Sequence, residues 1–251
     1  MSEERDLLRK RFLELGERSY SAGIFTFTDF LGLAEQSVFR ECARALGGIR
    51  YTLFGGAVGC ERVMVRFGSE EELGYSVDFP IVCIKAEPKN QKFADKLTHR
   101  DFLGALLNLG IERETLGDIA IIDNVGYIFA TEDIAPFILA ELSRAKHTDL
   151  TLSLTEPPTE SLFNTERRTI QISGERLDAV IAKTFSLSRD EAQLLFSRGL
   201  VFATGREINS VSYQPKTDEV VSVRGKGRFI YRGIEGLSRK GKLNVAVDVY
   251  V

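Results

Sequence analysis

Residues 172–231 carry the pattern that most constrains how this chain of 251 residues can fold. Apolar side chains recur at helical spacing from Leu177 to Ile181, which indicates a helix with one buried face. A second helix is predicted after Ser188, because this serine and Glu191 have the spacing of a capping box. A glycine ends that helix, and two apolar runs of strand character follow. The stretch therefore predicts a small domain in which two helices pack on a sheet.

Positive charge is concentrated at the end of this stretch. In residues 224–228 basic residues alternate with glycines, which lack side chains and let the backbone approach a phosphate closely. Residues 171–251 contain 13 basic and 9 acidic residues, a net charge of +4, whereas residues 1–170 carry −7. From residue 224 to residue 242, seven cations face a single acid, Glu235. This asymmetry places a surface for an anionic partner at the C-terminal end.

Four motifs of the same stretch occur together: Arg176-Leu177-Asp178, Ser188-Arg189, Gly199-Leu200-Val201 and Arg224-Gly225-Lys226-Gly227-Arg228. Together they resemble the S-four RNA-binding domain, named after ribosomal small-subunit protein four. The resemblance implies an αL-motif surface made by the second helix and the basic strand end. The side chains expected to contact RNA there are Arg176, Ser188, Arg189, Gln193, Arg224, Lys226 and Arg228.

Residues 77–154 predict a second domain with the element order β-α-β-β-α-β. This is the split β-α-β, or ferredoxin-like, plait, which also serves as the RNA-recognition module. A capping box and a following glycine mark the ends of its first helix. The expected strands are residues 81–84, 119–122, 127–130 and 150–154, and the expected helices run from Thr98 to Leu109 and from Thr131 to about Lys146.

Two positions in this domain are candidates for a further RNA contact. Tyr127 and Phe129 fall on the third strand, where RNA-recognition modules stack bases, but aromatic residues in strands also pack in cores, and both interpretations stay open. The start of the first helix could hold a phosphate. The possible second contact there consists of Lys96, His99 and Arg100.

The N-terminal residues 1–75 predict a mainly helical region with short strands. Helical periodicity covers residues 6–15 and 36–46, and short strands are expected at residues 51–54 and 63–65. Residues 55–59 are rich in glycine but lack the Gly-x-Gly-x-x-Gly spacing of a nucleotide-binding loop. We interpret them as a turn between strands.

Three longer motifs, in residues 97–106, 109–113 and 117–119, resemble the bacterial YlmH family, and the resemblance covers nearly the whole chain. It implies a non-enzymatic, ribosome-associated protein encoded near cell-division genes. Family members are linked to ribosome quality control, where they hold peptidyl-tRNA on a split large subunit during C-terminal tailing of stalled chains. The partners implied are rRNA, tRNA and the large ribosomal subunit, with no DNA and no membrane.

The predicted fold class is α+β, in four parts. Residues 1–75 form the N-terminal helical region, residues 76–155 the ferredoxin-like or RRM-like plait, and residues 156–171 a polar linker around Pro157-Pro158. Residues 172–251 form the S-four domain with a basic C-terminal extension.

We expect no metal and no cofactor, and we expect the protein to be cytoplasmic. The chain contains only two histidines, and its three cysteines lie far apart without a paired motif. No apolar run approaches the length of a membrane span, and the charged first residues do not resemble a secretory signal.

Two other functions stay open. S-four modules also precede pseudouridine synthases and rRNA methyltransferases, and Asp178 would be the nucleophile of a synthase. Glu175 interrupts that motif, however, and only about twenty residues follow Tyr231, too few for a catalytic domain. Asp178 is instead expected to orient Arg176 or to cap a helix. In the third hypothesis the chain is an adaptor of the cell-division machinery, and RNA binding is incidental.

Overall fold

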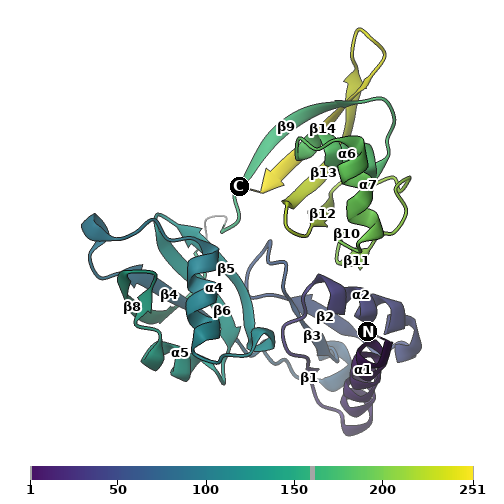
Figure 1. Cartoon of the computed structure of the whole chain (residues 1–251). Coiled ribbons are helices and arrows are strands. Elements are labelled where there is room, and N and C mark those ends of the chain that lie inside the picture. Colours follow the sequence, from purple (N-terminus) through teal and green to yellow (C-terminus); the bar gives the residue numbers. More distant parts are fainter. Residues whose placement is uncertain (1, 159–161, 251) are drawn as a thin grey trace. The chain divides into compact units, whose positions relative to one another are not determined.

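The computed structural model describes residues 2–158 and 162–250 and divides the chain into two compact units, residues 1–162 (unit 1) and residues 163–251 (unit 2) (Figure 1). Helices and three antiparallel sheets make up the described chain, so the predicted mixture of α and β structure is confirmed. Unit 1 contains two apolar cores among its described residues, and unit 2 contains one. Among the described residues, no helix combines the length and the apolar character needed to cross a membrane.

Unit 1 begins with a long helix packed beside a three-stranded sheet of order β1-β3-β2. The Phe39 ring lies at the centre of this core, 5.3 Å from the Phe12 ring and 6.0 Å from the Phe67 ring in edge-to-face geometry. The first helix exceeds the expected residues 6–15 at both ends, and ion pairs of Arg5 and Arg9 with Glu41 hold its charged first turns. The elements are α1 (Ser2–Ala22), β1 (Thr26–Phe27), α2 (Leu33–Cys42), the 3₁₀ helix η1 (Ala43–Leu46), β2 (Tyr51–Phe54), β3 (Met64–Phe67) and α3 (Glu70–Leu73).

The rest of unit 1 is a five-stranded sheet of order β5-β6-β4-β8-β7, with α4 and α5 packed on one face. Phe102 and Ile138 of these helices share a core with Ile84 and Ile128 of the central strands, and all four are fully buried. The elements are β4 (Ile81–Pro88), η2 (Gln91–Phe93), α4 (His99–Asn108), η3 (Arg113–Thr115), β5 (Leu116–Ile122), β6 (Val125–Thr131), α5 (Ala135–Glu141), β7 (Arg144–Ala145) and β8 (Thr148–Thr155).

Short-range signals fix the ends of these elements. The capping box predicted for Thr98 and Asp101 starts α4, and Gly110 follows its end at φ +80°. Asp123 and Asn124 both have positive φ, at 48° and 65°, as a two-residue turn between paired strands requires.

The second helix of this sheet is shorter than expected. It runs from Ala135 to Glu141 and not from Thr131 to near Lys146, because Thr131 ends strand β6. Pro136 lies in its first turn as predicted. The chain then reverses in the β7–β8 hairpin, where Lys146 has φ +53° and Ala145 is buried. An apolar residue at position 145 fits the pattern of a helix and that of a strand equally well. Periodicity alone therefore could not tell a longer helix from a helix followed by a strand.

The sheet face opposite the helices is partly covered by residues 55–59. This segment connects β2 and β3, as the turn interpretation predicted. Gly56 has φ +99°, and a Cβ there would lie 2.3 Å from the ring of Phe129, which is fully buried. Core packing is therefore the correct interpretation of Phe129, because its ring does not reach solvent. Tyr127 lies beside Lys85 on the same face and remains partly exposed.

Unit 2 places two helices on one six-stranded sheet of order β11-β10-β12-β13-β14-β9 (Figure 1). Leu177, Val180 and Ile181 of the first helix are fully buried against the strands, as their spacing predicted. The elements are β9 (Thr165–Ile172), α6 (Leu177–Thr184), α7 (Arg189–Ser197), β10 (Val201–Ala203), β11 (Arg206–Glu207), β12 (Glu219–Val223), β13 (Gly227–Leu237) and β14 (Leu243–Tyr250).

Unit 2 contains four strands where none was expected, namely β9, β11, β13 and β14. Residues 165–172 form edge strand β9, although they belonged mostly to the expected linker, of which residues 159–161 lie outside the described part of the chain. Residues 243–250 form β14 between β13 and β9, where a basic extension was expected. The side chains of β9 are mostly polar and exposed, as is common on edge strands, and such a sequence has little apolar alternation.

Replacing two glycines of unit 1 with alanine should change stability in opposite directions. Gly104→Ala, in α4 with no atom within 4 Å of the added Cβ, should raise the free energy of unfolding by about 1 kcal/mol. Gly56→Ala should lower it by roughly 2 kcal/mol, because the positive φ and the Phe129 ring both oppose a Cβ. Urea denaturation followed by circular dichroism measures both values. A Gly56→Ala protein as stable as the parent would contradict the packing of this segment on Phe129.

Candidate nucleic-acid interface

The side chains expected at the RNA surface of unit 2 meet at Asp178, which is fully buried in the first turn of α6. Arg176, the N-cap of α6, donates to its carboxylate from Nε and Nη2, each over 3.2 Å. Arg189, the first residue of α7, donates from the same two nitrogens over 3.0 and 3.2 Å. The Gln193 amide, one turn further along α7, adds a bond of 3.1 Å. One buried carboxylate thus accepts five hydrogen bonds from side chains at the starts of both helices.

These partners keep Asp178 ionised. Burial alone would raise the pKa of its carboxyl, but hydrogen bonds from Arg189, Gln193 and Arg176 outweigh burial, and the pKa is lowered. Two guanidinium groups against one carboxylate leave a net positive charge, and the arginine side chains remain 43% and 50% exposed. Within the described residues 2–158 and 162–250, Nη1 of Arg176 and Nη1 of Arg189 donate no hydrogen bond. The pair is therefore held in place with donors open to a ligand.

Ser188 sets the start of α7. Its hydroxyl accepts from the backbone amide of Glu191 over 3.2 Å, and its own amide donates to the Glu191 carboxylate over 2.8 Å. The capping box predicted from the sequence is confirmed. Ser188 thereby fixes the first turn in which Arg189 reaches Asp178.

The basic turn between β12 and β13 lies close to the connection of α6 with α7. A Cβ at Gly227 would lie 3.4 Å from the ring of Phe185, the residue that follows α6. Hydrogen bonds with Ser188 and, to a smaller extent, the charge of Lys226 lower the pKa of Glu191. The turn and the start of α7 therefore belong to one basic surface.

Aromatic rings hold two of the expected arginines. The guanidinium of Arg228 lies 3.9 Å from the centroid of the Tyr250 ring and 4.7 Å from that of Phe163. The guanidinium of Arg224 lies 5.2 Å from the centroid of the Phe202 ring. A cation–π contact restrains a side chain without neutralising it, so both residues keep their positive charge.

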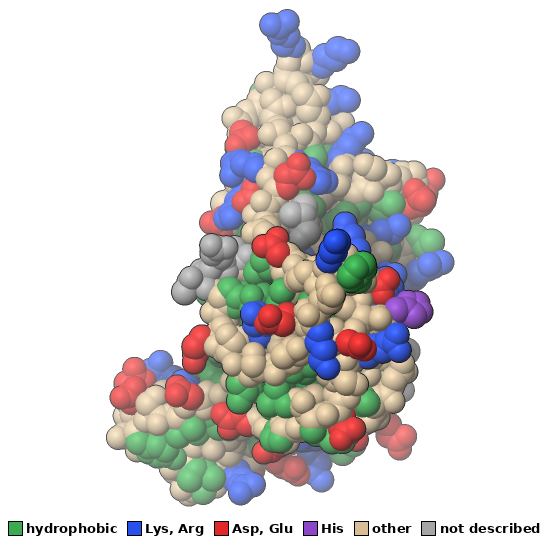
Figure 2. Space-filling view, turned by 90° about the vertical axis from the view of Figure 1, so that its left-hand side faces the viewer, with side chains coloured by type: hydrophobic (Ala, Val, Ile, Leu, Met, Phe, Trp, Pro, Cys, Tyr) green, Lys and Arg blue, Asp and Glu red, His purple; other side chains and the backbone are tan. Residues whose placement is uncertain are grey.

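A second basic group lies at the far end of the β13–β14 hairpin. Figure 2 shows Lys and Arg side chains there, and the loop contains Arg239, Lys240 and Lys242, all exposed. None of the three has an ion pair among the described residues, whereas two carboxylates bind Arg232 in the middle of β13. The positive charge of this region is thus concentrated at the two ends of β13.

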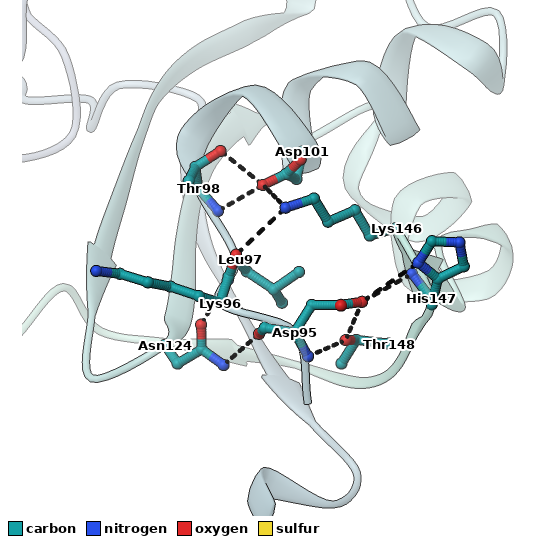
Figure 3. A network of polar contacts seen from close by, with 9 residues as sticks. All are labelled: Asp95, Lys96, Leu97, Thr98, Asp101, Asn124, Lys146, His147 and Thr148. Carbon is teal, nitrogen blue, oxygen red and sulfur yellow. Dashed lines mark hydrogen bonds and ion pairs between the residues drawn. The ribbon is translucent and has the colours of Figure 1, made fainter. Parts of the chain in front are cut away.

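The start of α4, expected as a second RNA contact, already holds a negative charge. The Asp101 carboxylate accepts from the backbone amide of Thr98 over 2.8 Å and lies 3.4 Å from Nζ of Lys146 (Figure 3). Hydrogen bonds from Thr98 and the charge of Lys146 hold the pKa of Asp101 below its ordinary value. The position expected for a phosphate is therefore occupied by a carboxylate of the protein itself.

The three residues expected there face different surroundings. Lys96 extends away from the polar network in Figure 3. Arg100 lines a groove together with Arg144. Desolvation and the charge of Arg113 lower the pKa of His99. Lys96 thus extends away from the polar network, whereas His99 and Arg100 are neighbours in the first turn of α4.

The sequence motifs connected Asp178 to Arg176 but did not reveal that Asp178 is also the hydrogen-bond acceptor for Arg189 and Gln193 of α7. A signal for this role was available. Arg189 and Gln193 lie four residues apart on one helix face, so a single acceptor can serve both, and Asp178 is the acidic residue in the first turn of α6.

Comparison with known proteins relates the chain to a family. Residues 76–159 match the family model described as "Putative RNA-binding domain in YlmH". The chain is 29% identical over 226 residues to the "Ribosome-associated protein quality control protein P2" of Bacillus subtilis (strain 168), covering 88% of this chain and 86% of that protein. It is also 36% identical over 76 residues to the small ribosomal subunit protein uS4 of Chromobacterium violaceum, covering 30% of this chain and 37% of that protein.

A solved structure is also similar to this chain in its fold. The cell division protein ylmH from Streptococcus pneumoniae matches with a TM-score of 0.50 and 22% identity, covering 63% of this chain and 94% of that one. The fold is thus YlmH-like. With the family model and the Bacillus relative, this match confirms the resemblance to the YlmH family that the sequence motifs predicted.

Removing the charge of Asp178 should destabilise unit 2 in a pH-dependent way. Because its pKa is lower in the folded than in the unfolded chain, its contribution is fully present above the unfolded pKa and is lost as the pH falls through the folded pKa. Asp178→Asn should therefore cost roughly 2 kcal/mol of unfolding free energy at neutral pH. The difference from the parent protein should shrink below about pH 4.

Urea denaturation of both proteins across pH 3–8 tests this prediction. Asp190→Asn is the matched control, because Asp190 is also in a first helical turn but is exposed. A difference between Asp178→Asn and the parent that stays constant across the whole range would contradict the role of the ionised carboxylate.

Proposed function

We propose that this chain is a non-enzymatic RNA-binding protein that associates with the ribosome through large-subunit rRNA, peptidyl-tRNA or both, and that acts in ribosome quality control. In this proposal unit 2 contains an S-four domain and unit 1 a ferredoxin-like plait. The observation that carries it is the arginine pair fixed by Asp178 beside the basic turn of unit 2.

The geometry of this pair suits phosphate. A guanidinium presents donors on more than one edge, so Arg176 and Arg189 can bond the buried carboxylate and still offer Nη1 outward. Side chains that are already ordered lose little entropy when a ligand binds. Arg224 and Lys226 extend the positive surface along the adjoining turn.

The relatives support RNA and ribosomes as partners. The matching family model is described as RNA-binding, one relative is named as ribosome-associated and another is a ribosomal protein. The structure from Streptococcus pneumoniae is named for cell division, but at 22% identity its likeness concerns the fold. We therefore prefer RNA binding to an adaptor role in division.

The surroundings of Asp178 favour binding over catalysis. A nucleophile must reach its substrate, and the Asp178 carboxylate is fully buried beneath Arg176, Arg189 and Gln193. The described residues after Tyr231 belong to the sheet of unit 2, as strands β13 and β14 and the loop between them. The proposal accordingly includes no cofactor and no metal.

Salt dependence of RNA affinity tests the proposed surface. The double variant Arg224→Gln, Lys226→Gln removes two exposed cations without touching the bonds of Asp178. If both contact phosphate, the slope of log affinity against log salt should flatten by about 1.4 on single-stranded RNA, since each contact contributes about 0.7. Arg198→Gln, Lys216→Gln is the matched control, because it removes two exposed cations elsewhere in unit 2. Equal slopes for both double variants would reject this surface.

Sedimentation tests the ribosomal partner. The full chain, mixed with isolated ribosomal subunits at low salt, should migrate with large subunits in a sucrose gradient. RNase treatment should release it, because the proposed contacts are to RNA. Migration with small subunits alone would contradict the choice of subunit and would point instead to a partner like that of the uS4 relative.

A further inference from the structure

Phe93, in the loop between β4 and α4, exposes 80% of its surface. Single exposed apolar side chains are common, so exposure by itself does not indicate a site. The neighbours of Phe93 distinguish it from an ordinary exposed residue, because three lysines lie within four residues of it in the sequence. The ammonium of Lys92 lies 5.7 Å from the centroid of the Phe93 ring. These lysines, none of which has an ion pair among the described residues, are Lys89, Lys92 and Lys96.

The loop that carries Phe93 is anchored on both sides. Before the ring, the amide of Lys89 donates to the carbonyl of Asp149 over 2.9 Å. After it, the amide of Asp95 donates to Oγ1 of Thr148, and its carbonyl accepts from Nδ2 of Asn124, each over 2.9 Å. These bonds anchor the backbone on both sides of Phe93, so the loop that presents its exposed ring loses little entropy when a ligand binds.

The anchors also separate the charges of the loop. Asp95 is the only acidic residue between positions 89 and 96, and Figure 3 shows its carboxylate turned toward Thr148 and His147. Lys96 extends in another direction, away from this network. The loop thus uses its negative charge internally and presents positive charge and one aromatic ring to the solvent.

We propose that Phe93 stacks on an unpaired base of single-stranded RNA, with Lys92 and Lys96 on the neighbouring phosphates. Proteins that bind single strands combine a basic surface with exposed rings, and every base offers a π face to such a ring. A lone ring among lysines provides too little continuous apolar area for a membrane or an apolar peptide. The inference rests on the RNA-binding function proposed above and gives unit 1 its own contact, on a loop away from the covered Phe129.

A tryptophan introduced at position 93 reports stacking directly. The chain contains no tryptophan, so the tryptophan emission of a Phe93→Trp protein, excited selectively over that of the tyrosines, comes from that position alone. Titration with a dye-labelled single-stranded RNA 12-mer at low salt should quench this emission. Tyr20→Trp is the matched control, because Tyr20 is 81% exposed on α1, and its emission should stay unchanged.

Anisotropy of the dye in the same titration separates the two proposals. Binding of the 12-mer without quenching at position 93 would overturn the stacking role and leave the RNA-binding function standing. No binding by either protein would reject the RNA-binding function and the stacking role together.

Affinity of the full chain for the same 12-mer gives a second readout. Phe93→Ala should weaken binding about tenfold, within the usual range for loss of one stacked base. Phe93→Tyr should bind like the parent, because it keeps the ring. An exposed loop side chain contributes little to folding, so both variants should melt at the temperature of the parent. Equal affinity of Phe93→Ala and Phe93→Tyr would overturn the proposal.

Discussion

The arrangement of the two helices of unit 2 depends on the hydrogen bonds that the ionised carboxylate of Asp178 accepts. A buried charge is costly unless it is paired and hydrogen-bonded, and here the compensation comes from the starts of two helices. Their relative position is therefore restricted by an electrostatic requirement in addition to apolar packing. Arg176 and Arg189 of the proposed RNA surface are thus also structural residues. Loss of RNA affinity after substitution of Arg189 would combine a lost contact with a disturbed helix pair.

The parts of the fold that sequence reasoning recovered are those coded over a few residues. The capping boxes at Thr98 and Ser188, the glycine after each helix, and the apolar stripe of α6 need only neighbours in the chain. Features set by distant partners were missed. Strand β9 exists because β14 pairs with it, and Phe129 is buried because Gly56 lies on its ring.

The same distinction applies to the candidate site. Sequence motifs identified most of its cations, because the residue types and their spacing were visible. They did not reveal which cations are restrained, since that depends on a shared acceptor and on aromatic rings from other strands. At the start of α4 a favourable helix terminus proved to be occupied by Asp101. A positive terminus alone therefore does not define an anion site.

The pairing of β14 with β9 has a consequence for the order in which unit 2 can fold. Strand β9 is at the edge of the sheet, and its partner β14 lies more than seventy residues further along the chain in the pair Ile172–Leu243 and further still in Thr165–Tyr250. During synthesis from the N-terminus, the helices and β10 to β13 can assemble while β9 still has no partner. Strand β9 joins the sheet only when the last strand, β14, has emerged. A chain interrupted before that point would retain the basic helix pair but leave β9 unpaired, with its backbone groups open to association with other strands.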